Sequence, residues 1–168
     1  MIKDHVRISS VQALPQFRLN LTFADNKSYI VDLSEWIENT TVLSALKDPE
    51  LFAQARVGFA GASVEWIKEE LDLGADNLRN LAVEQAGGIG HERIWNWLHE
   101  TGLTLDQAAT ALGISRRMLI YYRDGEKTIP RHIWLACLGW EATRPKDPKL
   151  LPPRIPSVQE YAAIHQLE

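Results

Sequence analysis

The run between residues 104 and 123 constrains the fold of this chain more than any other feature of its sequence. Ala108 and Ala109 place small side chains where two helices can approach closely, and Gly113 follows where a tight turn favours left-handed backbone. Apolar side chains recur around this turn at helical spacing, and they are Leu105, Ala108, Leu112, Ile114, Leu119 and Tyr122. The pattern predicts two short helices that cross at a tight turn.

Each boundary of these helices has a residue that favours it chemically. Thr104 and Gln107 have the spacing of a capping box, in which each side chain bonds the backbone N–H of the other residue. Ser115 is a suitable N-cap for the second helix, Gly125 a suitable end, and Pro130 a suitable start for the next helix. The predicted helices span residues 91–100, 104–112, 115–124 and 130–139.

The same run resembles the lambda-repressor/Cro-like helix-turn-helix family, whose pattern it matches without a gap at Gly102, Gly113, Ser115, Gly125 and Pro130. The resemblance implies a compact helical domain that binds double-stranded DNA, with the helix that begins at Ser115 in the major groove. Neighbouring helix starts and loops would then contact phosphates.

The resemblance also indicates which side chains face DNA. Arg116 and Arg117 lie at the start of the second helix, where an arginine can reach deep into the groove and bind guanine O6 and N7 together. Tyr121 lies one turn later, and Lys127 and Thr128 fall in a loop that would pass along the phosphates. The predicted DNA-binding residues are Thr104, Gln107, Ser115, Arg116, Arg117, Ile120, Tyr121, Arg123, Lys127 and Thr128.

Two positions differ from many members of that family. Leu105 stands where they have a glutamine that binds phosphate, which leaves that contact in question. Arg123 stands where they have a glutamate, which removes an internal ion pair and adds positive charge near the DNA face. Arg116 and Arg117 can also be interpreted as solvated charges on a helix surface, but the motif around them favours DNA contact.

Before residue 86 the apolar periodicity changes from helical to alternating. Phe17, Leu19, Leu21 and Phe23 alternate with polar residues, as is typical of a half-buried strand, and the alternation resumes at residues 29–33 after a turn. This pattern predicts a hairpin. Further strands are expected near residues 6–11, 55–59 and 63–67 in the same sheet, short helical turns near residues 34–38 and 49–52, and a helix capped by Asp76 that ends at Gln85.

The N-terminal half also resembles a small bacterial family known only as a domain of unknown function. The residues that carry this resemblance are Leu19, Leu21, Phe23, Asp25, Val31, Asp32, Leu33, Leu46, Asp48, Phe52, Val64, Glu65, Trp66 and Asp72. Ile67 stands where that family often has a proline. The resemblance implies a compact α+β unit and no particular activity.

We expect a domain boundary at Gly87 and Gly88, which supply a helix stop and a flexible joint. The predicted fold class is α+β, with a small N-terminal antiparallel-sheet module at 1–86 followed by an all-α lambda-repressor-like helix-turn-helix domain at 87–144. Residues 145–168 are expected to form a proline-rich strap and a closing helix, in which Ser157 and Glu160 make a capping box.

Charge is unevenly distributed along the chain, whose net charge is −4. Residues 1–86 hold 8 Lys and Arg against 13 Asp and Glu, a net charge of −5, whereas residues 87–144 hold 7 against 6, a net charge of +1. The acidity therefore belongs to the N-terminal module, which would dimerise, bind a ligand or recruit a second protein.

The sequence favours no enzyme class, cofactor or metal site. No phosphate-binding glycine loop, nucleophile elbow or catalytic triad signature is present. Cys137 is expected to be a buried small hydrophobe, and with His91, His99 and His132 it matches no familiar zinc spacing. The acidic run lacks the spacing of a calcium loop and is expected to form a solvated rim; its residues are Glu65, Glu69, Glu70, Asp72 and Asp76.

The tryptophans could stack single-stranded nucleic acid, but most lie in apolar periodic runs, which favours core packing; they are Trp36, Trp66, Trp95, Trp97, Trp134 and Trp140. The chain has no apolar run long enough to span a membrane and no signal-peptide layout, so a cytoplasmic location is expected. Our prediction is a homodimeric transcription regulator that binds double-stranded DNA sequence-specifically. The alternative is a protein-interaction or antitoxin-like module whose helix-turn-helix does not read DNA.

Overall fold

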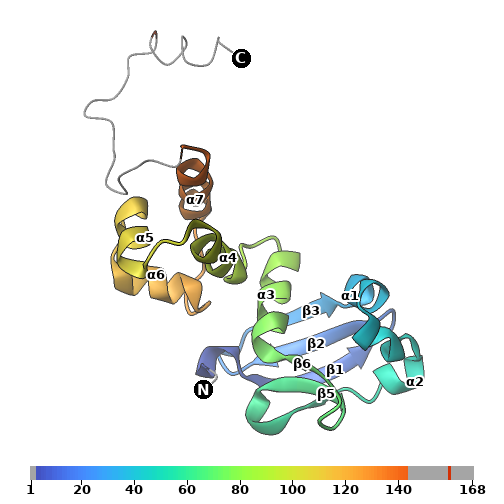
Figure 1. Cartoon of the computed structure of the whole chain (residues 1–168). Coiled ribbons are helices and arrows are strands. Elements are labelled where there is room, and N and C mark those ends of the chain that lie inside the picture. The colour runs from blue at the N-terminus through green and yellow to red at the C-terminus, as the bar shows by residue number, and fades with distance from the viewer. Residues whose placement is uncertain (1–2, 144–158, 160–168) are drawn as a thin grey trace.

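The computed structural model describes residues 3–143 and residue 159, and within them it is a mixed α+β chain (Figure 1). Two small antiparallel sheets with short helices between them make up the N-terminal part, and helices alone follow. Helix α3 (Ala75–Gln85) lies between the sheets and the later helices. The predicted order, a sheet-containing part followed by helices, is confirmed. The predicted strap and closing helix at 145–168 lie outside the described residues, apart from residue 159.

The first sheet contains three antiparallel strands in the order β1 (Ile8–Leu14), β2 (Arg18–Phe23) and β3 (Ser28–Asp32). The alternation predicted for β2 is observed, because Leu19, Leu21 and Phe23 are fully buried. Leu19 lies opposite Val31, and Leu21 lies opposite Tyr29, which sets the register of the hairpin. The predicted hairpin is therefore confirmed.

The second sheet contains β4 (Arg56–Val57), β5 (Ser63–Ile67) and β6 (Leu71–Gly74), again antiparallel. The prediction that these strands extend the first sheet is wrong, because the backbone ladders found among the described residues keep the two sets of strands separate. Alternation shows which face of a strand is buried but not which strand pairs with it. The sequence does not predict β6, since Leu71 and Leu73 stand among acidic neighbours that look like a solvated rim.

Short helices connect the strands: α1 (Ser34–Asn39), α2 (Pro49–Phe52), and 3-10 helices at Asp4–Val6, Thr41–Lys47 and Phe59–Gly61. The start of α2 has a clear chemical cause, because Asp48 Oδ1 accepts a hydrogen bond from Glu50 N at 2.9 Å and Pro49 occupies the first turn. The helical turns predicted near residues 34–38 and 49–52 are confirmed as α1 and α2.

Helix α3 begins at Ala75, two residues earlier than an N-cap at Asp76 allows. Asp76 lies in the first turn, so its prediction as the N-cap is wrong; Gly74 occupies that position without a side-chain hydrogen bond. The backbone N–H of Ala75 is already bonded to the carbonyl of Ala62 at 2.8 Å, so this end of the helix has less need of a cap. Asp76 instead lies beside His91, with Oδ1 2.9 Å from Nε2.

Buried apolar side chains form two clusters, one in each part of the chain. The first cluster lies between the sheets, α3 and the short helices, and includes Leu19, Leu21, Phe23, Val31, Leu46, Val64, Trp66 and Leu78. The second lies among the later helices and comprises Ile94, Trp97, Ala108, Ala109, Leu119, Tyr122, Ile129, Ile133 and Cys137. Each part therefore has its own apolar core.

The connection between the two parts is held by side chains. Glu84, near the end of α3, accepts a hydrogen bond from Gly90 N at 2.7 Å and forms an ion pair with Arg93. The Arg93 guanidinium lowers the pKa of Glu84, which keeps this carboxylate charged. Gly88 N also bonds the carbonyl of Val83 at 2.9 Å. Gly87 and Gly88, the joint expected to be flexible, are therefore spanned by contacts that run from α3 to residues 88–93.

Four helices form the second part: α4 (Glu92–Thr101), α5 (Leu105–Leu112), α6 (Arg116–Arg123) and α7 (Arg131–Thr143). The predicted ranges of the first three agree with these bounds to within one residue at each end. Helix α7 continues past its predicted end at Gly139, and the ring of Trp140 packs edge-on against Trp97 at 5.8 Å. Trp97 Nε1 also donates to the carbonyl of Cys137 at 3.1 Å, which ties α4 to α7.

Most of the tryptophan prediction holds, with one exception. Trp66 and Trp97 are almost fully buried, whereas Trp95 is half exposed beside Arg123. Cys137 is fully buried, as expected, and burial raises the pKa of its thiol to about 12. None of the helices in the described part of the chain has the length and apolar character that crossing a bilayer requires.

Candidate nucleic-acid interface

The start of α5 has the capping box that the sequence predicts. Thr104 Oγ1 accepts a hydrogen bond from Gln107 N at 3.2 Å, and Gln107 Oε1 accepts one from Thr104 N at 3.0 Å. These contacts use the acceptor oxygens of both side chains. The Thr104 hydroxyl hydrogen and the Gln107 amide group remain on an exposed surface.

The turn between α5 and α6 depends on one glycine. Gly113 has a φ of 68°, a left-handed conformation, and a side chain added there would meet no other atom within 4 Å. Glycine is therefore required by the backbone conformation and not by lack of space. The next residue, Ile114, returns a hydrogen bond from its N–H to the carbonyl of Ala109 at 3.0 Å. Ser115 Oγ then caps α6 by accepting from Met118 N at 3.1 Å.

Helix α6 has a buried face and an exposed face. Leu119 is fully buried and Tyr122 nearly so, which fixes the rotation of the helix against α4 and α5. Arg116 and Arg117 are exposed, while Ile120 and Tyr121 are half-buried. The structure therefore places Arg116 and Arg117 of the predicted set together on the outer surface of α6.

Arg116 has a partner on the preceding helix. Its Nε lies 3.2 Å from Asp106 Oδ1, and both side chains are largely exposed. An exposed ion pair of this kind contributes only about 0–1 kcal/mol. The pair orients Arg116 towards α5, but it is weak enough for Arg116 to exchange it for another partner.

A second group forms around the ring of Tyr121, and we call Arg117, Tyr121 and Lys127 the Tyr121 cluster. Arg117 Nε donates to the Tyr121 hydroxyl, and its guanidinium carbon lies 5.4 Å from the ring centre. Lys127 Nζ lies 5.0 Å from the same ring. In the described part of the chain, neither cation has a carboxylate within ion-pair distance. Two uncompensated charges are thus held beside the outer face of α6.

Arg123 differs from the other predicted residues. Its Nε lies 2.8 Å from Asp124 Oδ1, and its guanidinium carbon lies 5.0 Å from the ring centre of Trp95. The side chain is 22% exposed, so most of its surface is covered. Arg123 is therefore occupied by contacts within the second part, which its position in the sequence does not reveal.

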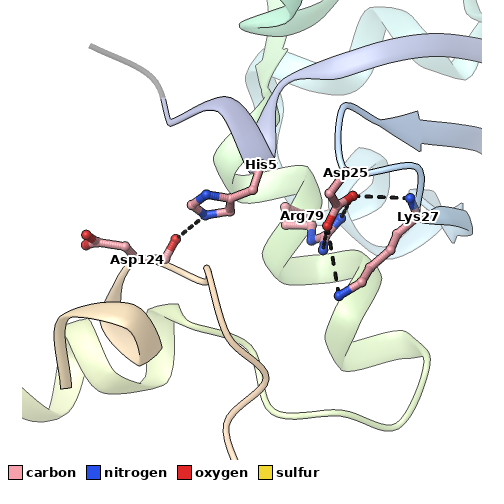
Figure 2. Close-up of polar contacts among 5 residues, drawn as sticks. All are labelled: His5, Asp25, Lys27, Arg79 and Asp124. Atoms are coloured by element: carbon pink, nitrogen blue, oxygen red, sulfur yellow. Dashed lines mark hydrogen bonds and ion pairs between the residues drawn. The ribbon is translucent and has the colours of Figure 1, made fainter. Parts of the chain in front are cut away.

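Asp124 joins the end of α6 to the start of the chain. His5 Nε2 is hydrogen-bonded to the carbonyl oxygen of Asp124 at 2.8 Å (Figure 2). Lys3 Nζ lies 2.8 Å from Asp124 Oδ2, as an ion pair that is not aligned as a hydrogen bond. Burial alone would raise the pKa of Asp124, but Arg123 and Lys3 lower it overall. No local sequence signal predicts this contact, since His5 and Asp124 lie 119 residues apart in the sequence.

The residues considered for metal binding do not come together. Within residues 3–143 and 159, no group of three His, Cys, Asp or Glu side chains could hold a metal ion. His91 is buried beside Asp76, and His99 and His132 are exposed on different helices. Of the acidic run, Glu65 pairs with Arg56 across β4 and β5, with Nε and Oε2 3.7 Å apart.

Known proteins resemble both parts of this chain. Residues 8–84 match the model of a family described as a protein of unknown function, DUF2442, so the predicted resemblance of the N-terminal half to such a family is confirmed. No helix-turn-helix family model matches, so that assignment stays a prediction.

A crystal structure from Nitrosomonas europaea ATCC 19718, of a protein described as a proposed DNA-binding protein, is similar to most of this chain. The two share 44% sequence identity with a TM-score of 0.80, over 90% of this chain and 96% of that one. No curated protein matches this chain. The similarity to the Nitrosomonas europaea protein extends through both parts, and this chain belongs to the same family, with residues 8–84 matching DUF2442.

Proposed function

We propose that this protein binds double-stranded DNA sequence-specifically through α5 and α6, which act as a lambda-repressor-like helix-turn-helix, and that it regulates transcription. The observation that carries the proposal is the exposed face of α6, where Arg116 and the Tyr121 cluster present three cations. The Nitrosomonas europaea relative, described as a proposed DNA-binding protein, supports the same function.

In this proposal the two arginines of α6 read base edges in the major groove. Arg116 exchanges its exposed contact with Asp106, worth about 0–1 kcal/mol, for a bidentate contact with guanine, worth about 1–3 kcal/mol of discrimination. The exchange is favourable because the contact that is lost is already solvated. Arg117 is held by Tyr121 at the start of the helix, so part of its side-chain freedom is lost before DNA binds.

The capping residues act as phosphate donors. Thr104 and Ser115 accept hydrogen bonds from the backbone through their hydroxyl oxygens, so each hydroxyl keeps its hydrogen for a phosphate. Gln107 uses Oε1 in the capping box and keeps its two amide hydrogens for the same purpose. Lys127 and Thr128, both exposed, extend this row along the backbone of the duplex.

Two of the predicted residues have secondary roles. Ile120, half-buried on the outer side of α6, supplies apolar contact in the groove, of the kind that a thymine methyl group accepts. Arg123 acts indirectly, because its contact with Asp124 fixes the end of α6 and its charge adds to the local field. We therefore expect Arg123 substitutions to alter affinity more than sequence preference.

One recognition helix reads few base pairs, so we propose a homodimer that places two α6 helices about 34–36 Å apart on one face of the duplex. Leu135 and Leu138 lie on one side of α7, where they are 54% and 43% exposed. Sedimentation equilibrium of the full chain tests the assembly: a monomer at micromolar concentration, with or without DNA, contradicts it.

The decisive experiment is selection of genomic fragments by purified protein at near-physiological salt. Wild type is compared with the Arg116→Ala/Arg117→Ala double variant and with Lys47→Ala/Lys68→Ala, a control that removes two exposed charges from the N-terminal part. Wild type and control should enrich one palindromic sequence, while the arginine variant should bind it at least about tenfold more weakly. Equal enrichment by all three proteins, or none by any, contradicts the proposal.

The exposed leucines of α7 favour a second candidate, a protein-interaction or antitoxin-like module. An apolar contact through Leu135 and Leu138 would persist as salt rises. DNA binding should instead weaken with a log–log slope of about −0.9 for each phosphate neutralised. A partner protein held equally at low and high salt, together with absence of DNA binding, favours this candidate.

A further inference from the structure

A cavity of about 190 Å³ lies where the two parts of the chain meet. Its lining comes from the β2–β3 turn, α3, the connection before α4 and the loop that follows α6. The lining residues with charged or strongly polar side chains are Lys27, Arg79, His91, Lys127 and Thr128. The cavity is therefore built by both parts and lies beside the predicted DNA-contacting loop.

The cavity is positively charged. Its lining includes Lys27, Arg79 and Lys127 and contains no carboxylate. Asp25 is not part of the lining, but it forms ion pairs with Arg79 at 2.7 Å and Lys27 at 3.9 Å (Figure 2). A second carboxylate, Asp76, lies 2.9 Å from His91 of the lining. Two carboxylates against three cations still leave an excess of positive charge at the cavity, which favours an anion.

Arg79 is a buried part of this site. Its side chain is only 4% exposed, and its two terminal nitrogens are bonded to Asp25 at 3.2 and 2.7 Å. The guanidinium carbon also lies 4.7 Å from the ring centre of Phe23 and 5.2 Å from that of Tyr29. Within the described chain its Nε is buried without a hydrogen-bond partner, which leaves one donor of a buried cation unsatisfied.

His91 is the second buried polar group of the lining. Its side chain is 3% exposed, and Nε2 lies near Asp76 but without hydrogen-bond alignment. Gly125, which also lines the cavity, leaves room for the imidazole, since a Cβ atom at residue 125 would lie 3.0 Å from His91 Nδ1. The ring is thus packed between both parts of the chain.

The remaining lining is apolar and includes Tyr29, Val83, Ile89 and Ile129. An inorganic ion would leave this surface in contact with water, whereas a ligand with an apolar body would cover it. The combination of cations with an apolar wall indicates an acidic group attached to a small hydrocarbon or aromatic body.

We propose that this cavity binds a small organic anion, either a carboxylate or a phosphate ester, that contacts both parts of the chain. Lys27 and Lys127 approach the acidic group from opposite parts, and the apolar wall receives the body of the ligand. Lys127 then serves two anions, the ligand and a DNA phosphate, so a bound ligand weakens DNA binding. This last effect rests on the proposed function, whereas ligand binding itself does not.

The test uses backbone amide NMR spectra of the full chain, titrated with benzoate, phenyl phosphate and benzamide. Benzamide is the neutral counterpart of benzoate and controls for simple apolar binding. The matched variants are Lys27→Gln/Lys127→Gln, which removes two exposed charges at the cavity, and Lys47→Gln/Lys68→Gln, which removes two elsewhere. Arg79 is not substituted, because the loss of a buried side chain would disturb folding as well as ligand binding.

At least one of the two anions should give saturable shifts at residues 27–29, 79–91 and 125–129, and benzamide should not. Loss of a charge-assisted hydrogen bond at the cavity should weaken that binding about tenfold in Lys27→Gln/Lys127→Gln, while the control variant binds as wild type does. The response identifies the acidic group as carboxylate or phosphate. No saturable binding by either anion, equal binding of benzamide, or unchanged binding by the cavity variant overturns the proposal.

A DNA arm separates this proposal from the function on which its last step rests. The anion that binds should lower the affinity of wild type for its selected DNA, and should not change the affinity of Lys27→Gln/Lys127→Gln as much. If wild type binds no DNA but the shifts are saturable, the ligand site stands and the proposed function fails. If DNA affinity is unchanged by a bound anion, the coupling is wrong.

Discussion

The two parts of this chain differ in the groups that lie beside their cationic side chains. In the N-terminal part, Arg79 is buried against Asp25 and the exposed Lys47 lies 3.2 Å from Glu38. In the C-terminal part, Arg117 and Lys127 lie against the ring of Tyr121. The first arrangement neutralises charge within the protein, and the second leaves it available to an external anion. The lack of a carboxylate partner, and not net charge, therefore distinguishes Arg117 and Lys127 of the candidate interface within the described part of the chain.

The largest expected effect tests whether the two cores are separate. Trp97→Ala removes the centre of the second core and its hydrogen bond to Cys137, and should lower the free energy of unfolding of that part by about 4 kcal/mol. The measurement is amide hydrogen exchange, in which α5 and α6 should lose protection while β2 keeps most of its own. Equal loss of protection in β2 contradicts the idea of two cores.

The next effect concerns the buried charge of the first part. Asp25→Ala leaves Arg79 without its partner and should destabilise the chain by about 3 kcal/mol in chemical denaturation. Glu38→Ala, which breaks an exposed pair, is the control and should change stability by less than about 0.5 kcal/mol. Similar losses in both variants would remove the contrast between buried and exposed pairing.

The same pair predicts a dependence on pH. Burial raises the pKa of Asp25, but hydrogen bonds from Arg79 and Lys27 outweigh it and hold the pKa below its usual value of 3.8. The pair therefore stabilises the fold above the unfolded pKa, and that contribution is lost as pH falls through the lower folded pKa. Wild type should lose stability in this acidic range, and Asp25→Ala should lose less.

The elements that the sequence predicts are those with a local cause. The capping box at Thr104, the left-handed Gly113 and the cap at Ser115 each act within a few residues, so α5 and α6 can be located from the sequence. The β2–β3 hairpin is predictable for the same reason, since its alternation and turn are adjacent. Most of the exposed face of α6 then follows from helical periodicity.

The features that the sequence does not predict depend on distant residues. Two sheets replace the single predicted one because strand pairing is decided by packing across the core. Arg116 contacts Asp106 on the preceding helix, and Arg123 contacts Trp95 on α4, so exposure alone does not tell which arginine is available. The cavity likewise needs residues 27, 79, 91 and 127 to meet, which only the folded chain shows.

A smaller effect tests the turn between α5 and α6. Gly113→Ala adds a side chain into open space but imposes a left-handed conformation on a residue that disfavours it. It should cost about 1–2 kcal/mol, and DNA affinity should be unchanged once the protein is folded. Gly139→Ala, inside α7 with equal space around it, is the control and should not destabilise the chain. Equal effects would mean that Gly113 is not required by its conformation.

The smallest effect addresses the contact that joins the two parts. Asp124→Asn keeps the backbone carbonyl that bonds His5 but removes the charge that pairs with Lys3 and Arg123. Because Lys3 is about half exposed, the loss of stability should be about 1 kcal/mol, and a double-mutant cycle with Lys3→Met should show coupling of a few tenths of a kcal/mol. Asp4→Asn, whose carboxylate is exposed, is the matched control. If Lys3 and Asp124 show no coupling, the parts are joined by the α3–α4 connection with its Glu84–Arg93 pair and by packing at His91, and the Lys3–Asp124 pair adds nothing to the arrangement of the cavity.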